Sequence, residues 1–480
     1  MKSPGRTHKR GLLVFVLLAA SVAGYLAVAS GKAETKKDIR YQRSIRGRIV
    51  SEYGPVARAR VRIAGEEEYT LSDEQGEFEL GTGHLRFKAA KLTAGKEGWF
   101  SNGRQVATSG YIGEIRLYPL PRGDNDDYRF ASPRECAQCH TKLTDYWSRA
   151  KMAYTTSNPK LHDMYYGKDA SGKSGVAPGY KLDNPGSEGN CADCHAPSAA
   201  ASPSRSKDLM TILRSEQTEW NGVSCDYCHK TRKVIKDRTR PSQMKPVLKR
   251  QAPVRGKSFL VFGPYDDVVN PAMAASYSPV YDQGRYCASC HSHVGKPAKG
   301  SGWDWSKVYT DSEWEDFGFA DNSSLPVQTT YQEWKSWQDG LSADDPDKGK
   351  SCQDCHMSWR KDMLPYDHFV VEGFARRRGW AVKRSPEDIN PHVFEGTTKT
   401  QLKSALSMEV VGETSGSTLK ARVYITNANG GHWIPTGETM RSLMLVLEAV
   451  DSGGTRLQLT RGRRLPDRKS TRLNSSHRLR

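Results

Sequence analysis

Residues 46–120 alternate apolar and polar side chains in short runs. The stretch that begins at Ile45 reads IRGRIVSEYGPVARARVRIAGEEEYTLSDEQGEFEL, and turn-forming residues interrupt the alternation at 53–55 and 73–76. A period of two places every second side chain on the same face of a β-strand. Short strands separated by turns at such intervals are typical of a small β-sandwich. We therefore expect a β-sandwich domain over residues 46–120.

A second alternating region lies towards the other end of the chain. It contains SMEVVGETSGSTLKARVYITN from Ser407 and LMLVLEAVDSGGTRLQL from Leu443. The same period predicts a β-rich C-terminal domain, which we place at residues 401–466 and expect to be truncated in this sequence.

The intervening region, about residues 128–400, shows little continuous periodicity. Connections rich in Gly, Pro and Ser occur at 170–189 and 196–206. Such a region is poor in aliphatic core residues, so its short helices and irregular segments need another source of apolar surface. The sequence thus predicts a multidomain protein, with a mainly α-helical and irregular domain between two β domains.

The two ends of the chain differ from its body. Basic residues precede an uncharged run from Gly11 to Ser30, which contains the A-x-A pattern of residues 27–29. Residues 1–30 therefore predict a signal peptide, or an uncleaved signal anchor, because the run is near the length that spans a bilayer. The sequence DRKSTRLNSSH, from Asp467, matches the translation of a sequencing adapter. We expect residues 467–480 to be an artefact outside the fold.

The cysteines follow one spacing. All ten belong to five C-x-x-C-H motifs, and none is left over: Cys136, Cys139 and His140; Cys191, Cys194 and His195; Cys225, Cys228 and His229; Cys287, Cys290 and His291; Cys352, Cys355 and His356. On a helical turn, residues i and i+3 lie on one face, so both thiols can reach the vinyl groups of one porphyrin. The adjacent histidine can then bind the iron. This is the attachment signature of haem c, and it predicts five covalently bound haems.

Other uses of paired cysteines explain the pattern less well. Five pairs do not divide into zinc sites of two pairs each, and a zinc ribbon needs no histidine after every second cysteine. A disulfide framework belongs to short secreted chains and needs no such histidine either. A thioredoxin-like motif would occur once, beside a βαβ pattern.

Each haem iron needs one or two axial ligands, and their identity separates electron transfer from substrate binding. The chain has 13 histidines. Five follow the cysteine pairs, His8 and His477 lie in the terminal segments, and His84 falls in the first β domain, where we expect it at the surface. Five further candidates remain: His162, His293, His368, His392 and His432.

The motifs together resemble the cytochrome c-554-type multihaem cytochromes. The resemblance covers roughly residues 130–440 and includes GNCADCHAP, NGVSCDYCHK, FGPYDDVVNPAMAASYSPVYDQGRYCASCH, SCQDCHM, NPHVFEG and GHWIPTG. It implies stacked haems with mostly bis-histidine ligation. By this resemblance His392 and His432 are the best distal ligands, followed by His293 and then His162 and His368.

Two methionines depart from the family pattern. Family members often carry histidine where this chain has Met152 and Met273. Methionine is a competent axial ligand that raises the potential of its haem, and it is also an adaptable filler beside a ring. Both interpretations stay open. The first β domain resembles carboxypeptidase regulatory-like domains through G-x-I, GPVARARVRI and SDEQGEFEL, which implies a fold and little about activity.

These features favour an electron-transfer protein that acts between periplasmic or extracellular redox partners. The alternative is an oxidoreductase that acts on a small nitrogen or sulfur compound at a five-coordinate haem; no C-x-x-C-K motif is present. A conductive surface or scaffold protein is a third option. The formal net charge of +18 does not predict nucleic-acid binding, because haem propionates would offset much of it and no clustered basic motif occurs. We expect an exported protein, in the periplasm or at the cell surface, either free or anchored through residues 1–30.

Overall fold

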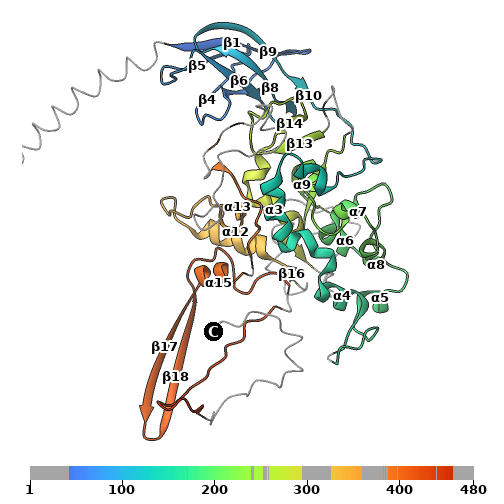
Figure 1. The fold of residues 1–480 in the computed structure, drawn as a ribbon, viewed down its shortest axis with the longest axis vertical. Helices are drawn as coiled ribbons and strands as arrows, with labels where there is room; N and C mark the ends of the chain where they lie inside the picture. The colour runs from blue at the N-terminus through green and yellow to red at the C-terminus, as the bar shows by residue number, and fades with distance from the viewer. Residues whose placement is uncertain are drawn as a thin grey trace, which may run out of the picture. The chain divides into compact units, whose positions relative to one another are not determined.

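The fold of this 480-residue chain was obtained as a computed structural model (Figure 1). It describes residues 43–169, 171–238, 243–251, 257, 259–294, 326–358, 382, 384, 388–396, 398–438 and 441–457. The chain divides into two compact units, which are described separately. The first comprises residues 1–120 and 266–269, and the second comprises residues 121–265 and 270–480.

The first unit consists of β-strands, as the alternation predicts. Its strands are β1 (Ser44–Ser51), β2 (Gly54–Pro55), β3 (Arg60–Ile63), β4 (Tyr69–Leu71), β5 (Glu77–Gly81), β6 (Ala89–Gly95), β7 (Trp99–Phe100), β8 (Asn102–Ala107), β9 (Gly110–Arg116) and β10 (Tyr118–Pro119). One sheet has the order β2-β1-β5, with β9 also paired to β1, and the other has the order β4-β3-β6-β8. The β1–β9 pair is parallel and sets Ile49 opposite Ile115.

Both four-stranded sheets contribute to one hydrophobic core. Its fully buried members include Ile45, Ile49, Val61, Leu92, Ala94 and Leu117. Inward residues alternate with exposed ones along β5, which runs exposed, buried, exposed, buried. Two sheets that enclose one core through alternating side chains are the arrangement of a β-sandwich. The alternation in the sequence therefore corresponds to the observed inner faces.

A short segment from the middle of the chain, residues 266–269, packs within this first unit. The Asp266 carboxylate lies 2.7 Å from Arg62 Nη2, and its side chain is only 2% exposed. The backbone N–H of Gly65 donates to Asp267 at 2.8 Å. A Cβ atom on Gly95 would lie 2.2 Å from the Asp266 carbonyl oxygen, so this close approach requires glycine. Burial raises the pKa of Asp266, although Arg62 acts in the opposite direction.

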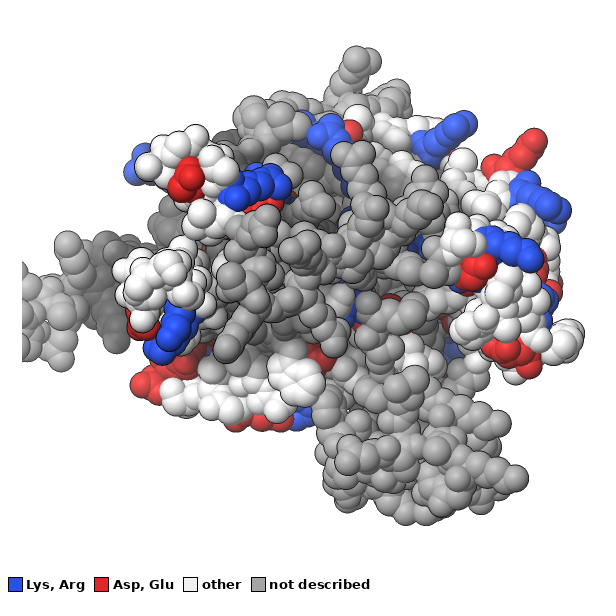
Figure 2. All heavy atoms as spheres, turned by 90° about the horizontal axis from the view of Figure 1, so that it is seen from below, with Lys and Arg blue, Asp and Glu red and all other residues white. Residues whose placement is uncertain are grey.

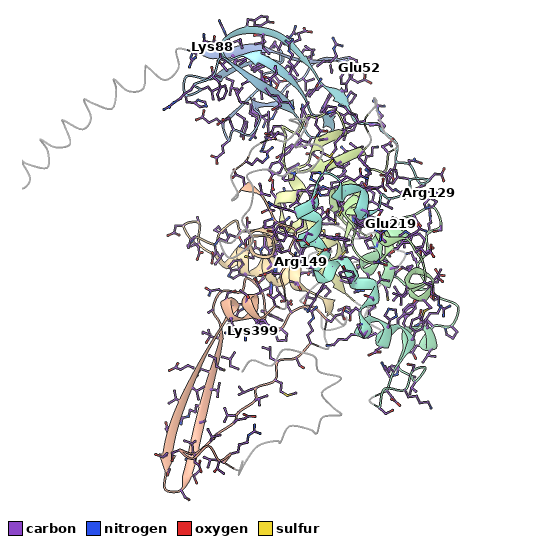
Figure 3. The ribbon with its side chains drawn as sticks, viewed as in Figure 1. Glu52, Lys88, Arg129, Arg149, Glu219 and Lys399 are labelled. Atoms are coloured by element: carbon purple, nitrogen blue, oxygen red, sulfur yellow. The ribbon has the colours of Figure 1, made fainter. Side chains whose placement is uncertain are left out.

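The second unit contains many short helices. They are α2 (Pro133–Ala137), α3 (Thr141–Arg149), η1 (Lys151–Ser157), α4 (Pro159–Tyr166), α5 (Tyr180–Asp183), α6 (Cys191–His195), α7 (Pro197–Ala200), α8 (Leu209–Leu213), η2 (Thr218–Trp220), α9 (Cys225–Lys230), η3 (Pro279–Asp282), η4 (Gly284–Tyr286), α10 (Ala288–His291), α12 (Thr330–Gly340), α13 (Cys352–His356) and α15 (Lys399–Ala405). Arg149 at the end of α3 pairs with Asp145 at 2.6 Å (Figure 3). None of the helices in the described part of the chain is both long and apolar enough to cross a membrane. The predicted signal segment, residues 1–30, lies outside the described residues.

Pairs of short strands connect these helices. They are β11 (Thr231–Lys236) with β12 (Met244–Leu248), β13 (Phe259–Gly263) with β14 (Met273–Tyr277), and β15 (His293–Val294) with β16 (Pro326–Gln328). The β13–β14 pair is parallel, and the other two pairs are antiparallel. The apolar residues of this unit form several small clusters, and attachment cysteines pack against two of them. In this region, which was predicted to be poor in aliphatic core residues, Cys191 and Cys228 thus lie beside small apolar clusters.

The C-terminal β region is a long two-stranded hairpin in the described residues. Strands β17 (Leu406–Ser415) and β18 (Thr418–Asn427) pair along their whole length (Figure 1). Almost all of their side chains are exposed, on both faces of the hairpin. The later alternating stretch contributes one isolated bridge, between Val450 and Arg456. The predicted strands are therefore present in part, without a buried face among the described residues.

Candidate haem-binding region

Each of the five C-x-x-C-H motifs lies on or beside a short helix. In the first motif the backbone N–H of His140 donates to Cys136 O at 2.9 Å, and in the fourth His291 donates to Cys287 O at 2.9 Å. This helical turn places the two cysteines of a motif on one face. All ten thiols are free, and none is paired in a disulfide.

In the third and fifth motifs, local capping explains why the helix begins at the first cysteine. Ser351 and Asp354 form a reciprocal capping box at α13, in which Ser351 N–H donates to Asp354 Oδ2 at 2.7 Å. Ser224 caps α9 by accepting from the backbone N–H of Tyr227. Such caps satisfy backbone donors that would otherwise be unpaired at a helix start. A serine directly before the first cysteine therefore helps to set the motif's conformation.

Cysteines of different motifs lie close together. In three pairs of cysteines from different motifs, one thiol perturbs the pKa of the other: Cys136 and Cys225, Cys194 and Cys290, and Cys287 and Cys352. The third and fourth motifs are also linked, because Tyr286 OH donates to Cys228 O at 2.9 Å. The five attachment points thus form one connected cluster, in which the first motif contacts the third, and the fourth contacts the second, third and fifth.

Two motif histidines each face a histidine from a distant part of the chain. The rings of His229 and His392 have centroids 6.2 Å apart and an interplanar angle of 25°. The rings of His356 and His432 have centroids 6.1 Å apart and an interplanar angle of 4°. His392 and His432 are the two residues that the family resemblance indicates as the best distal ligands.

The spacing of these rings fits a metal held between them. An imidazole nitrogen binds a metal at about 2.0–2.1 Å, and the ring centroid lies about 1.1 Å beyond it, so two opposed rings have centroids roughly 6.2–6.4 Å apart. Rings in van der Waals stacking would lie closer together. The residues present therefore fit a haem iron with two histidine ligands at each pair.

The other nitrogen of each of these rings is already engaged. His229 Nδ1 donates to Phe262 O at 2.6 Å, His392 Nδ1 donates to Asn390 O at 3.0 Å, and His432 Nδ1 donates to Trp433 O at 2.9 Å. His356 Nδ1 donates to Glu395 O. A carbonyl can only accept, so the proton is on Nδ1 and the lone pair is on Nε2. Such bonds fix the tautomer and the orientation of a metal-binding imidazole.

The remaining candidates lie in varied environments. His162 Nε2 lies 2.6 Å from Thr156 O, which engages the nitrogen that would usually bind iron. His293 lies on β15 opposite Gln328. Two histidines of the C-x-x-C-H motifs also differ in their hydrogen bonds. His291 Nδ1 lies 3.1 Å from Gln328 Nε2, whereas His195 Nδ1 has no hydrogen-bond partner in the described part of the chain. His368 lies outside the described residues.

The two methionines lie in packed or paired segments, whereas His84 lies at the surface. Met152 packs against the cluster of Phe130, Val223 and Tyr227, which also contacts Cys228. Met273 begins β14 and pairs with Phe259 of β13. The ligand role and the filler role of each methionine stay predictions. His84 lies at the surface, 3.8 Å from Glu68.

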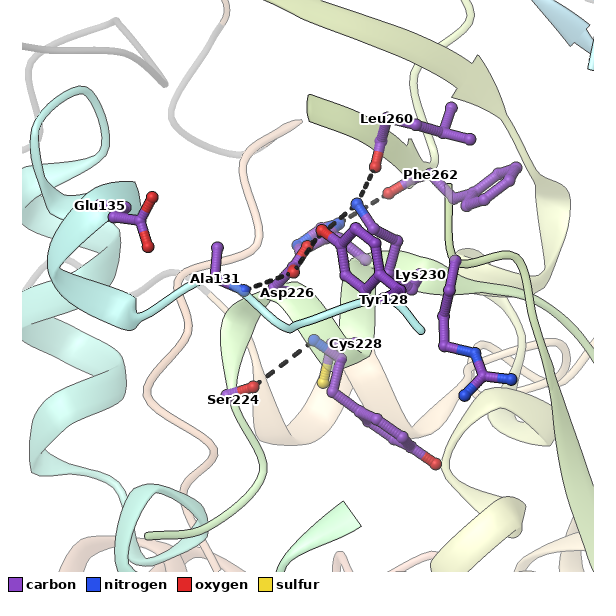
Figure 4. Close-up of polar contacts among 12 residues, drawn as sticks. Tyr128, Ala131, Glu135, Ser224, Asp226, Cys228, Lys230, Leu260 and Phe262 are labelled. Atoms are coloured by element: carbon purple, nitrogen blue, oxygen red, sulfur yellow. Dashed lines mark hydrogen bonds and ion pairs between the residues drawn. The ribbon is translucent and has the colours of Figure 1, made fainter. Parts of the chain in front are cut away.

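A buried ion pair between Asp226 and Lys230 flanks His229, the histidine of the third motif. The sequence alone did not indicate this pair. Lys230 Nζ lies 3.0 Å from Asp226 Oδ1, and the two side chains are 0% and 3% exposed. Asp226 Oδ2 accepts from Tyr128 OH and from Ala131 N–H, each at 2.8 Å, and Lys230 donates to Leu260 O (Figure 4). The signal in the sequence was an acid and a base four residues apart within C-D-Y-C-H-K. Such pairs usually lie on exposed helix faces.

Comparison with known proteins supports the predicted class. Residues 135–230, which span the first three motifs, match the family model described as cytochrome c554 and c-prime. Among solved structures, a penta-haem cytochrome c552 from Thermochromatium tepidum is 19% identical, with a TM-score of 0.41, over 69% of this chain and 74% of that chain. A mutant type II cohesin–X–dockerin complex from Acetivibrio cellulolyticus is 13% identical, with a TM-score of 0.14, over 30% of this chain and 86% of that chain. The comparison with curated proteins gives no match.

The family match and the repeated attachment motif together support a multihaem c-type cytochrome, which binds haem c covalently and takes part in electron transfer. This agrees with the class predicted from the sequence. The match does not extend to residues 46–120, so the resemblance of that unit to carboxypeptidase regulatory-like domains stays a prediction.

Proposed function

We propose that this protein transfers electrons between redox partners through five covalently bound haems, and that two of these haems have bis-histidine ligation. The observation that carries the proposal is the opposition of two imidazole pairs, at 6.2 and 6.1 Å. An iron held between two histidines has no open coordination position. Such a site favours electron transfer over substrate binding.

The residues of this chain hold and tune the cofactor. When bound, haem c supplies reversible one-electron cycling of its iron. The paired thiols of each motif anchor the ring, and the histidine that follows binds the metal. The Phe262 and Glu395 carbonyls accept from His229 and His356, which increases the basicity of the ligating nitrogens. A more basic ligand favours the oxidised iron and so lowers the reduction potential.

The contacts between motifs support a continuous route for electrons. The third and fourth motifs lie at its centre, because between them they contact each of the other three. We infer a path in which the first haem exchanges electrons with the third, the third with the fourth, and the fourth with the second and fifth. The close attachment points would keep neighbouring macrocycles near enough for electron exchange.

Location and partners follow from the chemistry of the cofactor and the N-terminal sequence. We infer an exported protein of the periplasm or cell surface that exchanges electrons with protein donors and acceptors. On the described part of the face in Figure 2, Lys and Arg side chains alternate with Asp and Glu. This mixture suits transient docking of redox proteins more than nucleic-acid binding. The first unit, which resembles carboxypeptidase regulatory-like domains, would serve as a spacer or docking module.

The test combines a cofactor count with a spin-state spectrum of the mature protein. A pyridine haemochrome assay and intact mass should give five haems per chain, and the ferric protein should be predominantly low-spin and unreactive towards cyanide, nitrite and hydroxylamine. A dominant high-spin signal that shifts with these ligands would instead favour the alternative, an oxidoreductase with a five-coordinate haem. A mass without haem would refute both functions.

A further inference from the structure

A buried carboxylate holds the loop that carries His432. Glu333 lies on α12, and its side chain is among the buried polar groups of the protein. Its Oε1 accepts from Thr329 Oγ1 at 2.8 Å, and its Oε2 accepts from Trp433 N–H at 3.1 Å and from Thr436 Oγ1 at 2.7 Å. Within the described chain these donors are neutral groups, and two of the three belong to the loop. A buried carboxylate needs such donors, because removing it from water is otherwise costly.

The position of these bonds matters for His432. Trp433 directly follows His432, so the bond from its N–H fixes the backbone at the histidine. Asn427 Nδ2 donates to His432 O at 2.8 Å, which is the carbonyl of the same peptide group, and to Gly430 O at 3.2 Å on the N-terminal side of His432. The loop's Thr436 also contacts Thr330 Oγ1 at 2.8 Å, at the start of α12. The backbone on both sides of His432 is therefore held by side-chain hydrogen bonds.

Helix α12 presents a second residue to the same loop. Trp337 lies four residues after Glu333, on the same face of the helix. A Cβ atom on Gly431 would lie 2.6 Å from the Trp337 ring, so the loop packs directly against the indole. The helix thus contacts the residue before His432 through Trp337 and the residue after it through Glu333.

Apart from its contact with Trp337, the loop that carries His432 buries little apolar surface in the described structure. Trp433 is 66% exposed, and the β17–β18 hairpin that leads into the loop is exposed along most of its length. Where hydrophobic burial is small, directional hydrogen bonds to a buried charge become the main determinant of position. Glu333 supplies these bonds.

We infer that Glu333 is a positioning residue that keeps His432 opposite His356, and so keeps the haem of the fifth motif six-coordinate. This inference rests on the proposed axial ligation by His432. Glu333 does not touch the metal; it acts through the backbone of Trp433 and the side chain of Thr436. Loss of this carboxylate releases the loop and leaves the His356 haem with an open position.

The experiment compares spin state and CO binding of the reduced protein in five variants. His432→Ala removes the proposed ligand, Glu333→Ala and Glu333→Gln remove the carboxylate, and Thr436→Val removes one donor. Asp339→Asn is the matched control, because it changes an exposed carboxylate on the same helix. Haem content, measured as pyridine haemochrome, is compared across all variants.

We expect His432→Ala to convert one haem of the five to a high-spin form that binds CO. Glu333→Ala should give the same change at the same haem, Glu333→Gln and Thr436→Val should give a partial change, and Asp339→Asn should give none. If Glu333→Ala does not yield protein with its full haem content, the rates of CO binding by Glu333→Gln and Thr436→Val test the positioning role of Glu333. CO binding by His432→Ala but by none of the Glu333 and Thr436 variants overturns the role of Glu333. A fully low-spin His432→Ala protein instead overturns the proposed ligation itself.

Discussion

Lys230 Nζ lies 3.0 Å from Asp226 Oδ1, and both side chains are almost completely excluded from water. The pair bridges His229 along one helical turn. Its hydrogen bonds also join the Tyr128–Ala131 segment and strand β13 to α9. Strand β13 supplies the carbonyl that accepts from His229 Nδ1. Three segments of the chain therefore meet at His229, the histidine of the third motif.

Removal of one member of this pair should destabilise the protein strongly. We expect Asp226→Asn or Lys230→Met to lower the free energy of unfolding by about 3–5 kcal/mol, because each leaves an uncompensated charge or unpaired donors in the interior. Chemical denaturation followed by absorbance and circular dichroism would measure the change. Arg149→Ala is the control, because its pair with Asp145 is exposed and should contribute less than about 1 kcal/mol. Equal losses in the buried and exposed variants would contradict the argument.

The double variant Asp226→Leu/Lys230→Met separates charge from packing. Replacing both partners removes the need to satisfy either charge, so the loss should be smaller than that of either single variant. Tyr128 and Ala131 would still lose an acceptor, which prevents full recovery. The same denaturation measurement applies, and a double loss equal to the sum of the single losses would show that the two residues do not act as a pair.

The nature of the distal ligand should set the potential of the third haem. His392 faces His229 at 6.2 Å, and methionine in place of a distal histidine raises the potential of a haem. We expect His392→Met to raise one midpoint potential by on the order of 100 mV, within the roughly 0.8 V range that axial ligands set. A spectroelectrochemical titration would resolve the shift, with His84→Met as the surface control. Unchanged potentials would remove His392 from the ligand set.

The sequence contained the attachment sites and much of the N-terminal fold. Period-two alternation around Ile49 and Phe78 was sufficient to predict strands with one buried face, because both side chains point into the same core. The cysteine spacing alone indicated haem. His392 and His432 required the family resemblance, since nothing local to either residue specifies which distant ring it faces.

Burial of charged residues could not be predicted in the same way. Glu333 and Asp226 have the spacing of ordinary helix-surface acids, and only tertiary contacts with Trp433 and Tyr128 show that they are interior anchors. The β17–β18 hairpin shows the converse. Its alternation predicts strands, which are present, but the described strands are exposed on both faces. In each case the environment of the residue depends on distant segments that local periodicity does not encode.

A glycine beside the third motif should tolerate no side chain. A Cβ atom on Gly222 would lie 2.2 Å from Met152 O and 2.6 Å from the Ala153 carbonyl carbon, and these are backbone atoms that cannot rotate away. We expect Gly222→Ala to reduce the free energy of unfolding by about 1–3 kcal/mol. Gly340→Ala is the matched control, because nothing lies within 4 Å of the corresponding Cβ position. Its stability should be unchanged or slightly higher, since alanine has the better helix propensity.

The ion pair between Arg62 and Asp266 should determine whether residues 266–269 stay packed in the first unit. Asp266 is buried, and Arg62 approaches it at 2.7 Å, whereas Arg60 lies at 3.5 Å with a more exposed side chain. Arg62→Ala would leave the carboxylate with only the weaker partner, so we expect a loss of about 3 kcal/mol and faster hydrogen exchange at Gly65, whose N–H donates to Asp267. Arg46→Ala, at an exposed position of β1, should leave both measurements unchanged. Unaltered exchange at Gly65 in Arg62→Ala would show that the backbone contacts of the segment hold it without the ion pair.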